Sequence, residues 1–186
     1  MSDPFFFGYG SLVNRATHAY TPAYRARLVG WRRAWKHTQG RVTPFLTGVP
    51  DAGSVIDGLV ALVPGADWAA LDLREEGYLR HSVAHGLTVD ASVPVAAQVY
   101  AVPPASVVTQ ADPAPMLLSY VDVVVQGYLR EFGEAGAQDF FATTDGWDIP
   151  VLDDRAAPRY PRAQVLSVAE RAFVDSGLAG VGARVI

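Results

Sequence analysis

The stretch FFFGYGSL, residues 5–12, decides how this sequence is interpreted. Three consecutive phenylalanines predict a buried strand over residues 5–9, and a glycine-punctuated turn that ends in a hydroxyl follows it. Gly8 and Gly10 have no side chain, so a ligand can approach this backbone closely, and successive N–H groups can form an anion-binding nest. The alternative is an edge strand that ends in an ordinary turn.

The turn differs from the common glycine motifs. There is no third glycine at the dinucleotide-binding spacing, and no Gly-Lys-Ser/Thr follows as in a phosphate loop. Leu12 and Val13 follow Ser11, so the turn is not the Gly-x-Ser-x-Gly nucleophile elbow either. Its function has to be inferred from the rest of the chain.

Composition limits the class of protein. A chain of 186 residues, half of them hydrophobic, can bury one sizeable core, and we expect a single domain over residues 1–186. The net charge of -4 makes nucleic acid an unfavourable partner. The absence of cysteine excludes disulfides, thiol catalysis and sulfur-ligated metals. Without a membrane-length apolar run or a signal-peptide pattern, the expected location is cytoplasmic, with no membrane partner.

Strands and helices are expected to alternate along the chain. Besides the strand at 5–9, alternating or apolar runs predict strands over residues 25–37, 54–63, 87–89 and 95–102. The positive charges of 25–37 are expected on its outer face, and Gly58 indicates a bulge or a close backbone approach. Helices are expected after Asp67 as N-cap, over 112–132 and over 167–175, with loops between Gly133 and the last helix.

The segment DWAALDLREEGY, residues 67–78, carries the candidate chemistry. At helical spacing, the side that should face the core holds Trp68, Leu71, Glu75 and Leu79. Glu76 lies toward the edge of that side. A carboxylate in an apolar stripe is costly to bury, and burial raises its pKa toward the range of a general base. The alternative for Glu75 is a structural ion pair with Arg74, Arg80 or another arginine.

The segment 112–132 shows a second apolar stripe. Its members at helical spacing are Leu117, Tyr120, Val121, Val124, Tyr128 and Phe132. A buried phenol usually finds a hydrogen-bond partner, but periodicity alone assigns both Tyr120 and Tyr128 to core packing. Gly127 should lie near the face of Tyr120 and allow close packing there.

Neither the histidines nor the acidic residues predict a metal site. His81 and His85 are four residues apart, but the segment is a poor helix without the glutamate of a metalloprotease, so we expect both to be exposed and non-catalytic. Four aspartates lack the spacing of a calcium-binding loop: Asp145, Asp148, Asp153 and Asp154. Neighbouring prolines and arginines predict a loop held by ion pairs, which could cover a pocket.

Taken together, these features resemble the gamma-glutamylcyclotransferase family, which includes AIG2-like and ChaC-like proteins. Its Tyr-Gly-Ser loop after the first strand is similar to residues 9–12, although Leu12 stands where some members have Asn. Its Leu-Asp-x-x-Glu pattern, which carries the catalytic base, is similar to residues 71–75, and the Arg-Glu pair of the glutathione-specific branch matches Arg74 and Glu75. A Tyr with a Gly seven residues later matches Tyr120 and Gly127. The resemblance covers roughly residues 5–136.

The resemblance implies an α+β fold, a mixed β-barrel flanked by helices, on which residues 139–186 pack as a C-terminal extension. It implies an enzyme that converts a gamma-glutamyl peptide or amine to 5-oxoproline and a released amine or amino acid, without cofactor or metal. Glu75 would be the general acid/base. The implied substrate-binding residues are Tyr9, Gly10, Ser11, Leu12 and Tyr120.

Two alternatives remain open at the level of sequence. The same fold could serve as a non-catalytic module that binds a small metabolite or a partner protein. An enzyme could act on gamma-glutamyl-amines instead of peptides. The leaving group and the oligomeric state have no signature in the sequence.

Overall fold

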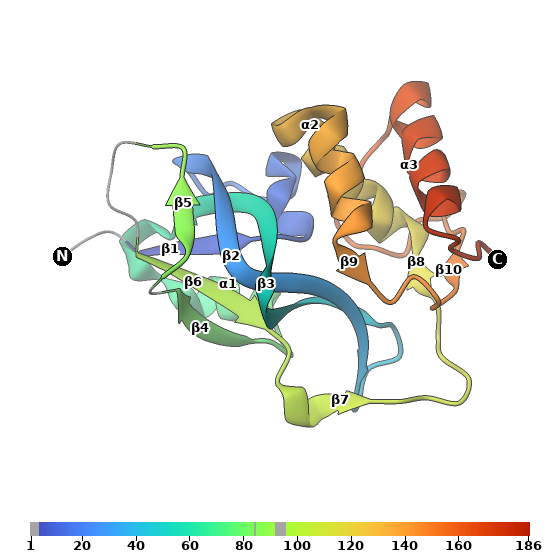
Figure 1. Ribbon diagram of the computed structural model, residues 1–186, viewed down its shortest axis with the longest axis horizontal. Coiled ribbons are helices and arrows are strands. Elements are labelled where there is room, and N and C mark those ends of the chain that lie inside the picture. The colour runs from blue at the N-terminus through green and yellow to red at the C-terminus, as the bar shows by residue number, and fades with distance from the viewer. Residues whose placement is uncertain (1–3, 84, 92–95) are drawn as a thin grey trace.

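The computed structural model describes residues 4–83, 85–91 and 96–186, and a strongly curled mixed sheet forms its centre (Figure 1). The sheet has eight strands in the order β4-β6-β1-β3-β2-β5, and β7 and β9 also pair with β2. Their bounds are β1 Pro4–Gly8, β2 Ala23–Thr38, β3 Phe45–Leu62, β4 Leu79–Val83, β5 Leu87–Val89, β6 Ala96–Ala101, β7 Val107–Val108 and β9 Thr144–Asp145. A two-stranded sheet pairs β8 (Met116–Leu117) with β10 (Val151–Leu152).

Helices flank the sheet, as the resemblance implied. The α-helices are α1 (Trp68–Arg74), α2 (Leu118–Ala142) and α3 (Val168–Gly180). In Figure 1, α2 and α3 lie together on one side of the curled sheet. Short 3-10 turns cover Ser11–Val13, Arg15–Thr17, Pro64–Ala66 and Pro104–Ser106. The expected fold class, a mixed, curled sheet with flanking helices, is therefore confirmed.

Strand β1 is central. It pairs antiparallel with β3 and parallel with β6, so the prediction of a buried strand is confirmed and the edge-strand alternative is wrong. Phe6 and Phe7 are almost completely buried. A side chain at Gly58 of β3 would overlap the carbonyl oxygen of Gly8, which confirms the expected close backbone approach. This contact fixes the end of β1, where the glycine-rich turn begins.

The hairpin of β2 and β3 forms the longest part of the sheet. The strand predicted at 25–37 is confirmed, whereas the one predicted at 54–63 is only the second half of β3. The first half of β3 was not predicted because the residues PDAGS at 50–54 are typical of a turn. They are accommodated because the register shifts between Val29 and Trp31, opposite Pro50, and such irregularities tolerate proline.

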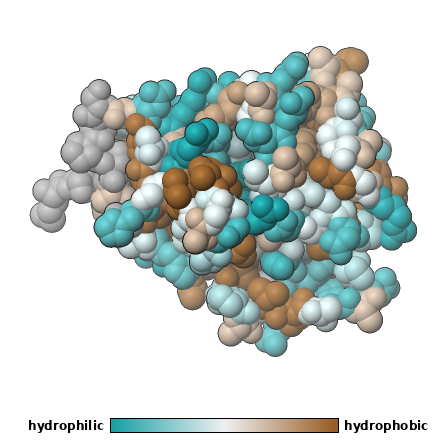
Figure 2. All heavy atoms as spheres, in the orientation of Figure 1, coloured by the Kyte–Doolittle hydropathy of each residue, from teal (hydrophilic) through white to brown (hydrophobic). Residues whose placement is uncertain are grey.

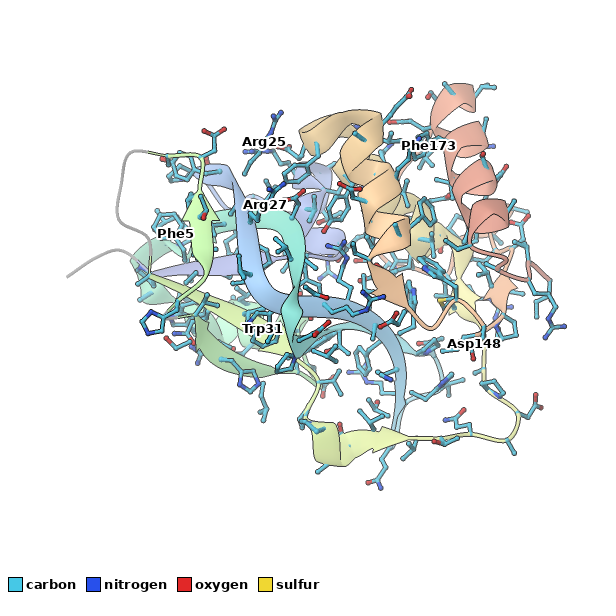
Figure 3. The ribbon with its side chains drawn as sticks, viewed as in Figure 1. Phe5, Arg25, Arg27, Trp31, Asp148 and Phe173 are labelled. Carbon is cyan, nitrogen blue, oxygen red and sulfur yellow. The ribbon has the colours of Figure 1, made fainter. Side chains whose placement is uncertain are left out.

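One charge on β2 faces inward, contrary to expectation. Arg25 and Arg27 are exposed (Figure 3), but Arg33 is 1% exposed. Its guanidinium donates hydrogen bonds to the Tyr128 hydroxyl at 2.9 Å and to the Thr144 hydroxyl at 3.1 Å, and it lies over the Tyr128 ring. The expectation was wrong because aromatic faces and hydroxyl acceptors can satisfy a buried guanidinium without a carboxylate.

The helix predicted at 112–132 has different limits. It begins at Leu118, since Pro113 and Pro115 cannot be accommodated in a helix interior. It continues to Ala142 beyond a break at Gly133, whose φ of 70° is in the left-handed region. The prediction of loops directly after Gly133 is therefore wrong, because a glycine can interrupt a helix without ending it.

The remaining elements agree in part with the prediction. The last helix is confirmed and extends to Gly180, and Ser167 and Glu170 form a capping box at its start. Strand β5 lies where it was predicted, and β6 confirms the strand at 95–102, of which Val95 lies outside the described residues. Strand β4 was not predicted. Among the described residues, no helix is long and apolar enough to cross a membrane.

The main core joins the sheet to α2 and α3. From α3, Val174 and Leu178 are buried in the same cluster as Phe7 and Val124. On the face shown in Figure 2, hydrophilic residues are interspersed with small hydrophobic groups. The C-terminal helix thus contributes to the core that supports the turn after β1.

Candidate active site

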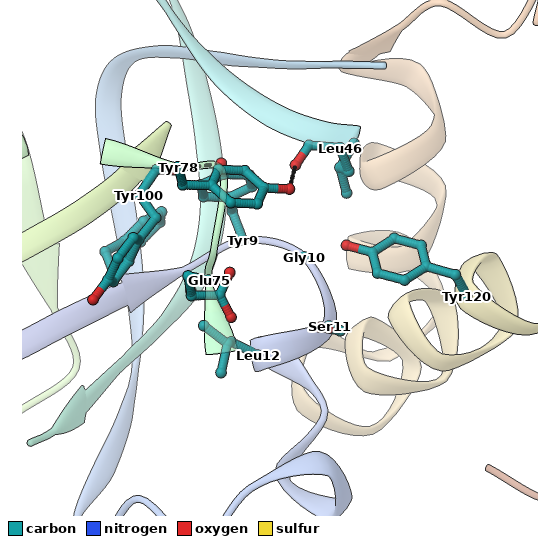
Figure 4. A pocket seen from close by; sticks show the side chains of 11 residues that line it. Tyr9, Gly10, Ser11, Leu12, Leu46, Glu75, Tyr78, Tyr100 and Tyr120 are labelled. Carbon is teal, nitrogen blue, oxygen red and sulfur yellow. Dashed lines mark hydrogen bonds between the residues drawn. The ribbon is translucent and has the colours of Figure 1, made fainter. Parts of the chain in front are cut away.

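A small cavity opens where β1 ends. It has a volume of about 30 Å³ and is lined by residues 7–12 together with Leu46, Glu75, Tyr78, Tyr100 and Tyr120 (Figure 4). The glycine-rich turn, the end of α1 and the start of α2 therefore meet at one place. All six residues singled out from the sequence line this cavity.

The turn is held against α2 by Asn14. Its side chain is buried and donates to the Val123 carbonyl at 2.9 Å and to Gln126 Oε1 at 3.0 Å. A Cβ on Gly127 would lie 2.7 Å from the Asn14 nitrogen. The expectation that Gly127 makes room beside Tyr120 is therefore wrong: it makes room for the backbone of the turn.

Tyr120 meets the turn two helical turns earlier, at Gly10. A Cβ on Gly10 would lie 2.8 Å from the Tyr120 hydroxyl oxygen, so any residue other than glycine at position 10 would displace this oxygen. Figure 4 shows the hydroxyl directed toward the turn. Burial raises the pKa of Tyr120 well above its usual value, and the Ser11 backbone N–H opposes this effect. Tyr120 is thus a neutral phenol in the cavity wall.

Tyr9 and Tyr128 connect the turn to the core. The Tyr9 hydroxyl donates to the Tyr100 carbonyl at 2.5 Å, and burial raises the pKa of Tyr9. The Tyr128 hydroxyl lies 2.9 Å from the Tyr9 carbonyl and 2.7 Å from the Asp57 carbonyl, and it can donate to one of them at a time. Tyr128 belongs to the core, as expected, and its hydroxyl also anchors the turn.

Glu75 reaches the cavity from the end of α1. The expected helical stripe is wrong in detail: the helix ends at Arg74, Leu79 belongs to β4 and is exposed, and the Asp67 side chain forms no cap. Glu75 is the C-cap, and its N–H donates to the Leu71 carbonyl at 2.9 Å. Its side chain is only 16% exposed.

The electrostatics of Glu75 combine the two alternatives considered for it. Burial raises its pKa, while the nearby charge of Arg74 opposes this effect. Arg74 Nε lies 3.2 Å from Glu75 Oε1, and the same guanidinium donates to the Thr17 carbonyl at 2.9 Å. Glu76 is 78% exposed and pairs with Arg41. The carboxylate is therefore oriented by an ion pair and still lies largely out of water.

Tyr78 and Tyr100 also line the cavity, and the sequence analysis did not single them out. The Tyr78 hydroxyl donates to the Leu46 carbonyl at 2.9 Å, and burial raises its pKa. The Tyr100 hydroxyl donates to Asp72 Oδ1 at 2.6 Å. The signal for Tyr78 was Gly77, whose φ of 98° reverses the chain after α1. Tyr100 lies on β6 and carries no local signal.

The residues considered for metal binding lie elsewhere. His81 and His85 are exposed. Asp145 pairs with Arg32, and Asp154 accepts hydrogen bonds from the backbone and hydroxyl of Ser119 at 2.7 and 2.6 Å. No group of three or more potential metal ligands occurs within residues 4–83, 85–91 and 96–186.

Comparison with known proteins decides the family. A family model described as gamma-glutamyl cyclotransferase, AIG2-like, matches residues 6–135. The chain belongs to this family. A search among curated proteins for similar sequences found no match. The matched span contains the turn, Glu75, Tyr120 and Gly127, whereas the rest of the chain from residue 136 lies beyond it.

Solved structures of low sequence identity share the fold. One named gamma-glutamyl cyclotransferase is 15% identical, with a TM-score of 0.60 over 92% of this chain and 98% of that one. An uncharacterised human protein is 17% identical, with a TM-score of 0.58 over 92% and 97%. YkqA from Bacillus subtilis is 17% identical, with a TM-score of 0.57 over 78% and 57%. At this identity the likeness concerns the gamma-glutamyl cyclotransferase fold.

Proposed function

We propose that this protein is a gamma-glutamyl cyclotransferase that converts a gamma-glutamyl peptide or amine to 5-oxoproline and the released amine or amino acid. The observation that carries the proposal is a largely buried carboxylate, Glu75, in the same cavity as the glycine-rich turn. A carboxylate with a raised pKa beside N–H groups that have no backbone acceptor is suited to an acyl transfer that needs one proton shuttle.

The reaction needs no nucleophile from the protein. The substrate's own α-amine attacks its γ-carbonyl carbon, a C–N bond of the five-membered ring forms, and the C–N bond to the leaving group breaks. Glu75 takes the proton from the attacking amine and gives it to the leaving nitrogen. Holding the substrate in the folded conformation supplies a large part of the rate, because ring closure is intramolecular.

The turn supplies the donors in this proposal. The N–H groups of Gly10 and Ser11 have no backbone acceptor among the described residues, and the Tyr120 hydroxyl lies against the same turn. Donors fixed before the reaction stabilise a carboxylate or a developing oxyanion without reorganisation. We assign substrate binding to the backbone of residues 9–12 and to Tyr120. The Tyr9 side chain has a structural role, since its hydroxyl is engaged elsewhere.

We also propose that the chain is one domain, with residues 139–186 as a C-terminal extension packed on the family fold. The first residues of this extension complete α2, which runs to Ala142. Leu166, Val174 and Leu178 are buried in the main core. Unfolding monitored by two spectroscopic probes should give one coincident transition, and two separate transitions would contradict this proposal.

The test of the function compares two adjacent carboxylates. Purified protein should release 5-oxoproline from at least one gamma-glutamyl compound in a panel of peptides, amines and glutathione. Glu75→Gln should lower kcat by on the order of a hundredfold or more with substrate binding largely kept, because the proton acceptor is lost. Glu76→Gln, the matched control, should be nearly silent.

Three other outcomes would overturn the proposal. Binding of a gamma-glutamyl ligand without turnover across the whole panel would favour the non-catalytic module. Full activity of Glu75→Gln would remove Glu75 as the base. An inactive Glu76→Gln together with an active Glu75→Gln would show that Glu76, and not Glu75, transfers the proton.

A further inference from the structure

A second, larger cavity of about 340 Å³ adjoins the first and shares Leu46, Tyr78 and Tyr120 with it. Its walls come from the hairpin of β2 and β3, from the end of α1, and from residues 159–162, which lie beyond the span matched by the family model. A substrate whose γ-carbonyl carbon lies beside Glu75 would place its leaving group here.

The charges in this wall are of one sign. Four of its residues are arginines, Arg41, Arg74, Arg159 and Arg162, and none is acidic. Arg41 is paired with Glu76 and Arg74 with Glu75. Arg159 and Arg162 have no carboxylate partner within 4.0 Å among the described residues, and the positive charge of Arg162 reaches Glu75. The wall thus carries two arginines that form no close ion pair with the described residues.

Trp35 and Tyr160 form an aromatic part of the same wall. Trp35 lines the outer cavity, is 4% exposed, and its indole N–H has no hydrogen-bond partner in the described part of the chain. A buried donor without an acceptor is unfavourable and is usually satisfied in proteins. Because this nitrogen has almost no accessible surface, Trp35 contributes to the wall without offering a hydrogen bond to the cavity. Trp35 and Tyr160 also pack edge-on against Tyr120, which joins the two cavities.

We propose that the outer cavity is an anion-binding subsite that selects gamma-glutamyl substrates whose leaving group carries a carboxylate, that is, an amino acid or short peptide instead of a simple amine. The proposal rests on the proposed function and adds the substrate class to it. In a gamma-glutamyl amino acid the leaving nitrogen and the carboxylate are attached to the same carbon. The carboxylate would therefore lie in the outer cavity, whose wall includes Arg74 and the arginines of residues 159–162.

A pair of substrates isolates this one charge. Gamma-glutamyl-alanine and gamma-glutamyl-ethylamine differ only by the carboxylate of the leaving group. Wild-type kcat/KM should favour the alanine compound by on the order of tenfold or more, since a charge-assisted hydrogen bond contributes at this level. A gamma-glutamyl diamine, with a cationic end, should be the poorest of the three. Gamma-glutamyl-alanyl-glycine tests whether a carboxylate one residue farther away is also accepted, which separates an amino-acid from a peptide leaving group.

Variants assign the preference to the wall. The double variant Arg159→Gln with Arg162→Gln should lose most of the preference for the alanine compound, measured as the ratio of kcat/KM for the alanine compound to kcat/KM for the ethylamine compound. Arg171→Gln, an exposed arginine on α3 outside this wall, is the matched control for charge and should keep the wild-type ratio. Equal kcat/KM for alanine and ethylamine compounds in wild type, or an unchanged ratio in the double variant, would overturn the proposal.

A binding measurement separates this proposal from the proposed function. Calorimetry with the two compounds, on protein with and without the arginine substitutions, needs no turnover. Carboxylate-dependent binding without any 5-oxoproline release would support the subsite and contradict the cyclotransferase. Turnover without a carboxylate preference would support the cyclotransferase and contradict the subsite.

Discussion

Replacing Gly127 by alanine tests how the glycine-rich turn is held. In a helix interior, alanine is favoured over glycine by about 1 kcal/mol. At this position, however, the new Cβ would lie 2.7 Å from the Asn14 nitrogen and 2.9 Å from its Cα. Reaching the 3.4 Å of ordinary contact requires a separation of about 0.7 Å between α2 and the turn.

The turn cannot make this movement without loss. Asn14 is held by hydrogen bonds of 2.9 and 3.0 Å to Val123 and Gln126, on the same helix as Gly127. Overpacking of a tight contact costs about 1–3 kcal/mol, which exceeds or cancels the helix-propensity gain. We expect Gly127→Ala to lower the free energy of unfolding by up to about 2 kcal/mol, or Tm by a few degrees.

The effect on activity should exceed the effect on stability. A displacement of about 0.7 Å at Asn14 also moves the backbone donors of residues 9–12 relative to Glu75, and misplacements near 1 Å can cost about a hundredfold in rate. The assay is 5-oxoproline release, with Tm measured on the same samples. Gly180→Ala is the control: it also lies in a helix, and its Cβ would meet nothing within 4 Å, so it should hold or raise Tm and leave activity unchanged. If Gly127→Ala behaves like this control, the contact does not position the turn.

Four further predictions follow from the site and its supports. Because burial raises the pKa of Glu75 above its ordinary 4.5, wild-type kcat/KM should fall as pH decreases through that raised pKa, and Glu75→Gln should lack this limb. The raised pKa of Glu75 also stabilises the folded state at low pH, and this stability is lost as pH rises through the folded-state pKa. The Tm difference between wild type and Glu75→Gln should therefore change with pH above 4.5. A Tm difference that stays constant with pH would contradict the raised pKa. Gly10→Ala should weaken ligand binding more than it weakens folding. Because the new Cβ would lie 2.8 Å from the Tyr120 hydroxyl oxygen, adding Tyr120→Phe should recover the lost stability. If calorimetric unfolding shows no recovery, the clash lies elsewhere. Arg155→Gln should cost about 3–5 kcal/mol in denaturant unfolding, since it leaves the 5%-exposed Asp122 without its partner at 2.7 Å, and a loss below 1 kcal/mol would show that Asp122 is otherwise satisfied.

Local patterns were sufficient for the elements closest to the site. The run of phenylalanines predicted β1, because a strand buried on both faces has few alternatives, and Gly58 predicted the close backbone approach of β3 to Gly8. The motif around Glu75 identified a residue in the cavity, and the side predicted to face inward was right: Leu71 is buried, and the Glu75 side chain is 16% exposed against 78% for Glu76. Helix α1 ends one residue before Glu75, and a C-cap position can direct a side chain inward as well as a helix face can.

Long-range contacts account for what the sequence analysis missed. Arg33 looked like a surface charge because its hydroxyl and aromatic partners come from residues about a hundred positions away. Tyr100 enters the cavity through the parallel pairing of β6 with β1, which no local pattern announces. The arginines of residues 159–162 carry no periodic signal, and only the folded chain brings them to the outer cavity.

The hydrogen bonds from Ser119 to Asp154 have a consequence for the synthesis of the chain. Asp154 accepts from the first turn of the helix that carries Tyr120, 35 residues earlier in the sequence. A ribosome delivers the glycine-rich turn and Glu75 early and Asp154 late, and contacts of large sequence separation form only once both partners have emerged. A nascent or prematurely terminated chain can therefore contain Glu75 while the first turn of α2 still lacks Asp154, its hydrogen-bond acceptor. Under the proposed function, the site should become competent only after Asp154 has left the ribosome.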